Sequence, residues 1–262
     1  MKYSASMKFL WADLPLPDRA RKAKENGFDS IELWDWRSED MAALQDACDE
    51  SDIYISGFFG HSSGGFRDPS MRRELLDNLA ESVEVAVRHG ADQLHMFSDG
   101  IRRPQGEIMK PPPITRIEQY ISCVEGVKEA VKLVEGKNIT LILEAINTVH
   151  VPGYFWEDAA ITVEMCRAVD HPQVQMSFDC FHQQLVAGRI TENLIASLPY
   201  TGRVDVANVP GRHQPDVGEI DYSYILKVLE QHNYNGMITF ETDPLNGDNE
   251  ACVKAIRSIF KF

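Results

Sequence analysis

Short apolar runs alternate with longer amphipathic segments from one end of this chain to the other. Eight of the runs are five or six residues long and rich in β-branched and aromatic residues, which is typical of strands buried in a parallel sheet. The predicted strands span residues 3–7, 30–34, 54–58, 93–97, 140–144, 174–179, 203–208 and 237–241. Apolar positions with helical spacing lie between them and predict a helix after each strand.

Eight strands that are each followed by a helix match the element order of a closed (β/α)8 barrel. The chain has 262 residues, close to the roughly 250 that such a barrel needs. No Ser/Gly-rich linker or low-complexity tract divides the sequence. We therefore expect an α/β fold with one (β/α)8 TIM barrel domain over residues 1–262.

The charge of the chain narrows the range of partners. With 26 basic against 40 acidic residues, the formal charge at pH 7 is −14. This charge opposes binding to nucleic acids and to anionic membranes, because both require a positive protein surface. We expect a small-molecule substrate, while the oligomeric state stays open and a homo-oligomer is not excluded.

Cysteine usage and hydropathy point to the cytoplasm. The five cysteines are widely spaced and form no CxxC pair, so we expect neither a disulfide framework nor a cysteine zinc site. The N-terminus lacks the continuous apolar region of a signal peptide. No stretch approaches the roughly 18 uninterrupted apolar residues of a membrane helix. The expectation is a cytoplasmic protein without a membrane span.

Acidic residues stand where several predicted strands end. Glu144 closes the run ITLILE, Asp179 closes VQMSFD and Glu241 closes GMITFE. In a (β/α)8 barrel the carboxyl ends of the strands form the active-site face, so these acids are expected at one mouth. Asp205, within RVDVAN of the predicted seventh strand, is expected to point into the same barrel.

Four carboxylates that converge on one mouth repel one another unless a cation lies among them. A divalent metal bound by Glu144, Asp179, Asp205 and Glu241 is the expected compensation. Oxygen ligands favour Mg²⁺ or Mn²⁺, since zinc normally recruits histidine or cysteine. A single acid at a strand end is more often a helix cap or an ion-pair partner, so Asp179 and Asp205 indicate a metal only as members of the set.

Four segments carry a more specific signal. They are LILEAINTVHVPGYF (141–155), QMSFDCFHQQLVAGRI (175–190), VANVPGRHQPDVGEIDY (206–222) and YNGMITFETDP (234–244). These segments resemble signature stretches of the hydroxypyruvate isomerases, which belong with the ketose 3-epimerases to the xylose isomerase-like barrels. The resemblance covers most of the chain, is strongest from about residue 140 onward, and implies a metal-dependent aldose–ketose isomerase, an intramolecular oxidoreductase.

The resemblance also implies roles for single residues. Glu144 and Glu241 match the two glutamates that bind the metal and act as the acid/base pair, so they are the expected catalytic residues. Asp179 matches a further metal ligand, and His182 and Arg212 match residues near the substrate. Such a site removes a proton beside a carbonyl, stabilises an enediolate and returns a proton to the neighbouring carbon.

Two positions depart from the family's pattern. Asp205 stands where the isomerases carry glutamine and the epimerases histidine, and His150 stands where the relatives usually carry an acid. We predict that Asp205 is nevertheless a metal ligand, with an ion pair to Arg203 or Arg212 as the competing interpretation. His150 is expected near the substrate.

Two further histidines and one loop belong to the expected mouth. His61 and His95 fall at the ends of the predicted third and fourth strands, where they are expected to contact substrate. A hydrogen-bonded structural histidine is an equally weighted alternative for both. The long loop 98–116, with three consecutive prolines, is expected to act as a lid.

Several functions are compatible with these residues. An isomerase of a small hydroxy-carbonyl compound is favoured, and a ketose 3-epimerase or a metal-dependent lyase or dehydratase is the alternative. A non-catalytic sugar- or acid-binding barrel would require the loss of Glu144 or Glu241, and both are present. A barrel phosphodiesterase acting on DNA fits poorly with the acidic charge. The sequence does not identify the physiological substrate.

Overall fold

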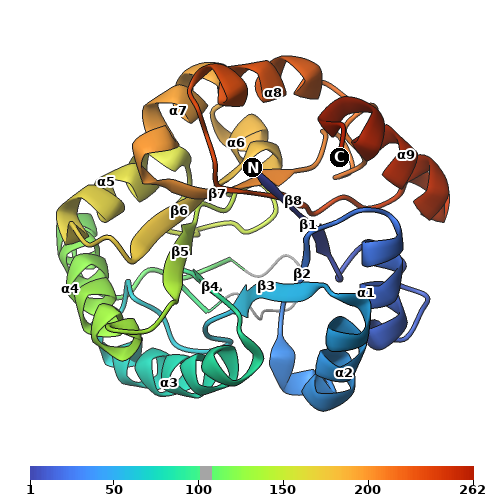
Figure 1. The fold of residues 1–262 in the computed structure, drawn as a ribbon. Helices are drawn as coiled ribbons and strands as arrows, with labels where there is room; N and C mark the ends of the chain where they lie inside the picture. The colour runs from blue at the N-terminus through green and yellow to red at the C-terminus, as the bar shows by residue number, and fades with distance from the viewer. Residues whose placement is uncertain (101–107) are drawn as a thin grey trace.

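The computed structural model describes residues 1–100 and 108–262. Eight parallel strands pair in sequence order, and β8 pairs with β1 to close the barrel (Figure 1). The strands are β1 (Lys2–Ser6), β2 (Ser30–Glu32), β3 (Tyr54–Phe59), β4 (Gln93–Met96), β5 (Thr140–Glu144), β6 (Val174–Asp179), β7 (Thr201–Val206) and β8 (Met237–Phe240). The expected (β/α)8 barrel is confirmed. The predicted lid over residues 98–116 includes residues 101–107, which lie outside the described residues.

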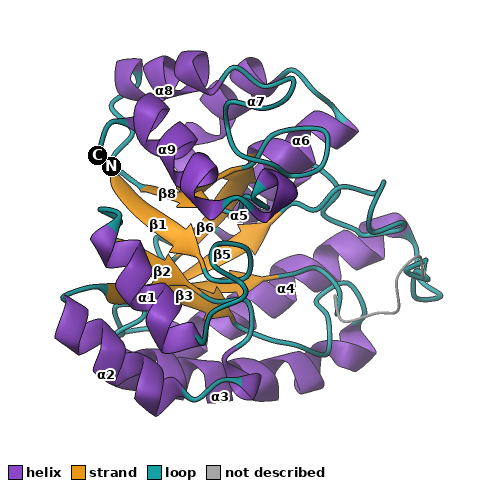
Figure 2. Ribbon diagram, turned by 90° about the vertical axis from the view of Figure 1, so that its right-hand side faces the viewer, coloured by secondary structure: helices purple, strands orange, loops and turns teal. Residues whose placement is uncertain are grey.

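Helices surround the barrel on its outer side (Figure 2). Within the described ranges they are α1 (Leu16–Glu25), α2 (Met41–Ser51), α3 (Arg72–His89), α4 (Arg116–Val134), α5 (Ala159–Val169), α6 (Cys180–Val186), α7 (Ile190–Ser197), α8 (Tyr222–Gln231) and α9 (Asn249–Phe260). Two helices, α6 and α7, follow β6, where one was expected. None of the helices in the described part of the chain is long and apolar enough to cross a membrane.

The boundaries of β7 differ from the predicted span 203–208. The strand begins at Thr201, directly after a short 3-10 helix, and ends at Val206. It stops there because the backbone N–H of Asn208 bonds to the carbonyl of His213 (2.8 Å), within the following loop. This bridge forms within the loop, and the apolar pattern that predicted the strand does not reveal it.

The ends of β8 and β2 also differ from the prediction. β8 ends at Phe240, so Glu241 is the first residue beyond the strand instead of its last. β2 ends at Glu32, short of the predicted residue 34, after a register shift between Ile31 and Glu32. Both changes leave the two glutamates at the carboxyl end of the barrel.

The centre of the barrel is polar. Two hydrogen bonds cross the interior between strands that are not neighbours, from Ser4 of β1 to Ser56 of β3 and from Arg203 of β7 to His95 of β4. All four side chains are buried. Barrel interiors are usually filled by branched apolar side chains, so this protein places hydroxyl and charged groups where most barrels place a core.

Apolar packing lies instead between the strands and the outer helices. Phe240 of β8 is fully buried, and its ring centroid lies 5.8 Å from that of Phe28 and 4.9 Å from that of Phe260 on α9. The ring of Tyr3 on β1 stacks on Phe240 at 6.2 Å. This aromatic cluster ties the last strand to the first and supports closure of the barrel.

Replacing Phe240 by Ala should lower the free energy of unfolding by about 3 to 5 kcal/mol, because a buried aromatic side chain is removed and a cavity remains. Urea denaturation followed by circular dichroism measures the change. The control Phe240→Leu retains most of the apolar volume and should lose clearly less. A loss below about 1 kcal/mol for the alanine variant would show that this cluster does not support the closure.

Candidate active site

Three acids gather at the carboxyl end of the barrel. Glu144 ends β5, Asp179 ends β6, and Glu241 follows β8. Their residues are 3 to 5% exposed. Because a buried carboxylate without partners is costly, the surrounding groups have to supply hydrogen-bond donors or cations.

Donor atoms from Glu144, Asp179 and His182 lie within 4.8 Å of one another. The helix start produces this grouping: Asp179 caps α6, where its Oδ1 accepts the backbone N–H of His182 (2.9 Å), which places that ring beside the acids. Clustered buried carboxylate oxygens are the donors that hard divalent cations prefer. The residues present therefore fit a divalent metal.

The ring of His182 is oriented by Asn147. Donors face both ring nitrogens: the backbone N–H of Asn147 points at Nδ1 (3.3 Å), and Arg212 Nη1 lies 3.1 Å from Nε2. Nε2 lies 3.6 Å from Asp179 Oδ2 and 3.9 Å from Glu144 Oε1. Asn147 and Arg212 therefore hold the ring of His182 beside the space between the acids.

Arg212 brings a cation to the same acids. It lies in the loop after β7 with a left-handed φ of 60°, and its guanidinium lies over the rings of Phe9 (5.5 Å) and Phe181 (5.0 Å). It donates to Asp179 Oδ2 (3.0 Å) and to the carboxylate of Glu241. Its side chain is 16% exposed, so this cation is both bound by the acids and accessible from solvent.

A second arginine, Arg203, lies inside the barrel and is fully buried. Its Nη2 donates to Glu241 Oε1 (3.1 Å), and its Nη1 donates to His95 Nε2 (2.7 Å). The other ring nitrogen of His95 lies 3.1 Å from Glu144 Oε2. The structure thus places His95 between Arg203 and Glu144, which agrees with the structural alternative for this histidine.

Asp205 points into the barrel, as expected, and is buried. One carboxylate oxygen accepts from Arg203 Nε and the other from the hydroxyl of Ser177. This is the ion-pair arrangement that was the competing interpretation of Asp205. Its role as a metal ligand stays a prediction.

The two glutamates have different electrostatic surroundings. Burial raises the pKa of Glu144 well above its ordinary value, and the charges of Glu241 and Asp205 raise it further. Burial also raises the pKa of Glu241, but the guanidiniums of Arg212 and Arg203 outweigh burial and leave that pKa lowered. Neighbouring carboxyl groups whose pKa values are moved apart in this way suit paired acid and base roles.

The other two histidines that were predicted to contact substrate, His61 and His150, have partners other than the three acids. His61 is buried, its Nε2 accepts the backbone N–H of Phe97 (3.1 Å), and its Nδ1 lies 3.0 Å from the carbonyl of Ser63. Both ring nitrogens are therefore used by the backbone, and burial lowers the pKa of His61 to about 4. His150 is exposed and stacks on Phe181 at 5.6 Å, beside Arg212.

Two buried residues of the site were not singled out from the sequence. Arg203 was considered only as a partner of Asp205, and Glu32 was not considered. Glu32 is fully buried, and its Oε2 lies 3.7 Å from Arg203 Nη1. An acid within the apolar run SIELW is the same signal that identified Glu144 in LILE, so this residue was detectable.

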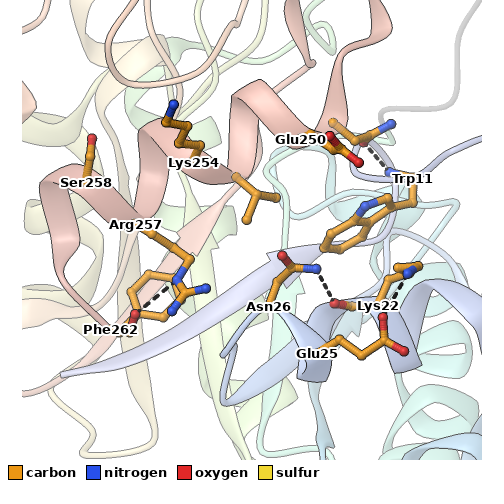
Figure 3. Close-up of a pocket in the computed structure, with 11 residues that line it drawn as sticks. Trp11, Lys22, Glu25, Asn26, Glu250, Lys254, Arg257, Ser258 and Phe262 are labelled. Atoms are coloured by element: carbon orange, nitrogen blue, oxygen red, sulfur yellow. Dashed lines mark hydrogen bonds and ion pairs between the residues drawn. The ribbon is translucent and has the colours of Figure 1, made fainter.

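A separate surface cavity of about 860 Å³ lies between α1 and α9 (Figure 3). Acidic and basic side chains line it together, among them Lys22, Glu25, Lys254 and Arg257. None of the predicted site residues is among the described residues that line it. The cavity is therefore separate from the buried acids.

Known proteins are similar to this chain in sequence and in fold. A putative hydroxypyruvate isomerase of Danio rerio is 28% identical over 271 residues, covering 100% of this chain and 96% of that protein. A 2-oxo-tetronate isomerase of Cupriavidus necator is 25% identical and covers 94% of each chain. The crystal structure of an AP endonuclease, family 2, from Brucella melitensis has a TM-score of 0.86 at 24% identity over 96% of each chain, a likeness that shows the fold alone.

The family follows from the extent of the match. Residues 20–261 match the family described as xylose isomerase-like TIM barrel. The two relatives are named as isomerases, and the match covers nearly their full lengths. This confirms the resemblance seen in the four motif segments. This chain belongs to the xylose isomerase-like TIM barrel family.

Proposed function

We propose that this protein is an isomerase that moves a carbonyl group between adjacent carbons of a small hydroxy-carbonyl compound. The pair Glu144 and Glu241 carries the proposal: two buried carboxyl groups share one barrel mouth but have opposite pKa shifts. The reaction needs a base to remove a proton beside the carbonyl and an acid to return one to the neighbouring carbon. The isomerase names of the relatives support the same reaction class.

The proposed metal ligands are Glu144, Asp179 and Glu241, with Asp205 as the predicted fourth ligand and Mg²⁺ or Mn²⁺ as the ion. The grouping of Glu144 and Asp179 donor atoms, and the burial of all three carboxyl groups, support this assignment. When bound, such an ion supplies a Lewis acid for the oxygens of the substrate. The proton transfers themselves are assigned to Glu144 and Glu241.

Arg212 and His182 are the proposed substrate contacts. Arg212 offers paired N–H donors at the opening of the site, and such a fork orients an anionic or polyhydroxyl substrate. The Nε2 atom of His182 lies beside the same space, 3.1 Å from Arg212 Nη1. The rings of Phe9 and Phe181 flank Arg212 and restrict how far its guanidinium can move.

A substrate panel tests the proposal and separates it from its alternatives. The purified protein is incubated in D₂O with hydroxypyruvate, a 2-oxo four-carbon acid and free ketoses, with added Mg²⁺ or Mn²⁺. Nuclear magnetic resonance then identifies the products. Aldose–ketose interconversion with deuterium beside the carbonyl supports an isomerase, whereas inversion at C3 indicates an epimerase and loss of water indicates a dehydratase.

Replacing Glu144 or Glu241 by Gln should reduce turnover by at least about 10² to 10⁴-fold, because each change removes a general acid or base and alters the metal shell. The far-ultraviolet circular dichroism should stay unchanged. Glu135→Gln, at an exposed position after α4, is the matched control and should keep full activity. Near-normal turnover in either active-site variant would remove the assignment of that glutamate.

Chelation should abolish activity and lower the melting temperature. A ligand that binds only the folded state stabilises it by mass action, by about 2.7 kcal/mol at 100 times its Kd. Adding Mn²⁺ or Mg²⁺ back should restore both quantities, which differential scanning calorimetry and the isomerase assay measure. Full activity after exhaustive chelation, with no metal detected by elemental analysis, contradicts the proposed metal site.

Asp205→Gln distinguishes the two interpretations of Asp205. If this carboxylate is the counter-ion of Arg203, metal affinity measured by calorimetric titration should change little, while the melting temperature falls because a buried ion pair loses one partner. A marked weakening of metal binding, greatest at low pH where protons compete for carboxylate ligands, would instead establish Asp205 as a ligand.

A further inference from the structure

Both proposed catalytic acids are connected to one buried guanidinium. Arg203 donates directly to Glu241 Oε1 (3.1 Å) and reaches Glu144 through His95, which lies 2.7 Å from Arg203 Nη1 and 3.1 Å from Glu144 Oε2. The four side chains come from β7, β4, the end of β5 and the residue after β8. A second path at the barrel mouth runs from Glu241 through Arg212 to His182, whose Nε2 lies 3.9 Å from Glu144 Oε1.

The chemistry of arginine determines the tautomer of His95. A guanidinium has only donors, so His95 Nε2 must accept the hydrogen bond from Arg203 Nη1 and carries no proton. A neutral imidazole has one N–H, which is then on Nδ1 and points at Glu144 Oε2. A doubly protonated ring would bring two N–H groups together at Nε2. Arg203 therefore makes His95 a donor to Glu144.

We propose that Arg203 is a positioning residue that sets both proton-transferring carboxyl groups, Glu241 by direct donation and Glu144 through the Nδ1–H tautomer of His95. The proposal rests on the isomerase function proposed above. A planar guanidinium suits this role because its Nη atoms point in fixed, different directions, whereas a lysine ammonium offers its donors from one freely rotating atom and lacks that fixed fork.

The position of Arg203 is itself fixed from the opposite side. Its Nε donates to Asp205, and Glu32 lies 3.7 Å from Nη1. Arg203 does not reach the substrate opening, because it is fully buried. The competing explanation is that it only neutralises Asp205 and Glu32 and that its contacts toward the catalytic acids are incidental.

Nitrogen-15 spectroscopy of labelled histidine tests the tautomer independently of activity. In the full-length protein loaded with Mg²⁺, His95 should show a protonated Nδ1 and an unprotonated, hydrogen-bonded Nε2, with the signal assigned through its loss in His95→Gln. A protonated Nε2 in the wild-type protein overturns the proposal. Because this measurement needs no substrate, it gives an answer even if the protein proves inactive on the isomerase panel, which would refute only the proposed function.

Kinetics of charge-balanced variants test the positioning role. The double variant Arg203→Met/Glu32→Gln removes one cation and one anion, and the single variant Glu32→Gln is its reference. The kcat of the double variant should be about 100-fold below that of the reference, the scale expected when reacting groups are misplaced by about 1 Å. The KM should change little, because Arg203 does not touch substrate. The His95 Nε2 signal should also move toward that of a nitrogen without a hydrogen bond.

Two further variants keep the test decisive. Arg203→Lys retains the charge but removes the fixed fork that holds His95 and Glu241 in place, so it should show a loss of kcat even if the double variant fails to fold. The control Arg72→Lys changes the first residue of α3, whose mostly buried guanidinium donates to Glu129 and Ser122 of α4, and it should alter stability alone. If kcat of the folded Arg203 variants stays within about threefold of its reference, or if only KM changes, the positioning role is refuted.

Discussion

Carboxyl groups in the centre of a barrel persist as charges only where cations and hydrogen-bond donors replace the water that they lose. In this protein Arg203 supplies that compensation to Glu32, Asp205 and Glu241 at once. Arg212 supplies it from the loop after β7. The same contacts therefore compensate the buried charges of the interior and bind the proposed catalytic groups.

The two arginines differ in their exposure to solvent. Arg203 belongs to a strand whose backbone is paired on both sides, and its side chain is fully buried. Arg212 belongs to a loop, retains some solvent exposure and is held by Phe9 and Phe181 through weak cation–π contacts. This difference suits the two proposed roles, a buried cation that positions the acids and a partly exposed one that meets the substrate.

Because the barrel interior is polar, the apolar packing lies between the strands and the outer helices. The hydroxyl groups of Ser4 and Ser56 bond to each other across the barrel, whereas Phe240 and its aromatic neighbours pack between strands and helices. Stability then comes mainly from the layer outside the strands, because that layer contains the apolar area removed from water. The inside of the barrel contains polar and charged side chains, among them the proposed catalytic acids.

The sequence by itself determined the order of strands and helices, the acids at strand ends and the family. These features are local: alternation and helical spacing extend over a few residues, and Glu144 and Asp179 end the strands that their own segments predicted. The motif segments are likewise read along the chain, which is why the family match over residues 20–261 confirmed them.

Only the tertiary structure decided which inward-facing side chains meet. Arg203 and His95 are 108 positions apart in the chain, and their contact depends on barrel closure and on the stagger between strands, which no local pattern contains. The same holds for Asp205, whose neighbours Arg203 and Ser177 decide how its charge is compensated. Periodicity predicts that a side chain points inward, but its partner across the barrel is set by the packing of all eight strands.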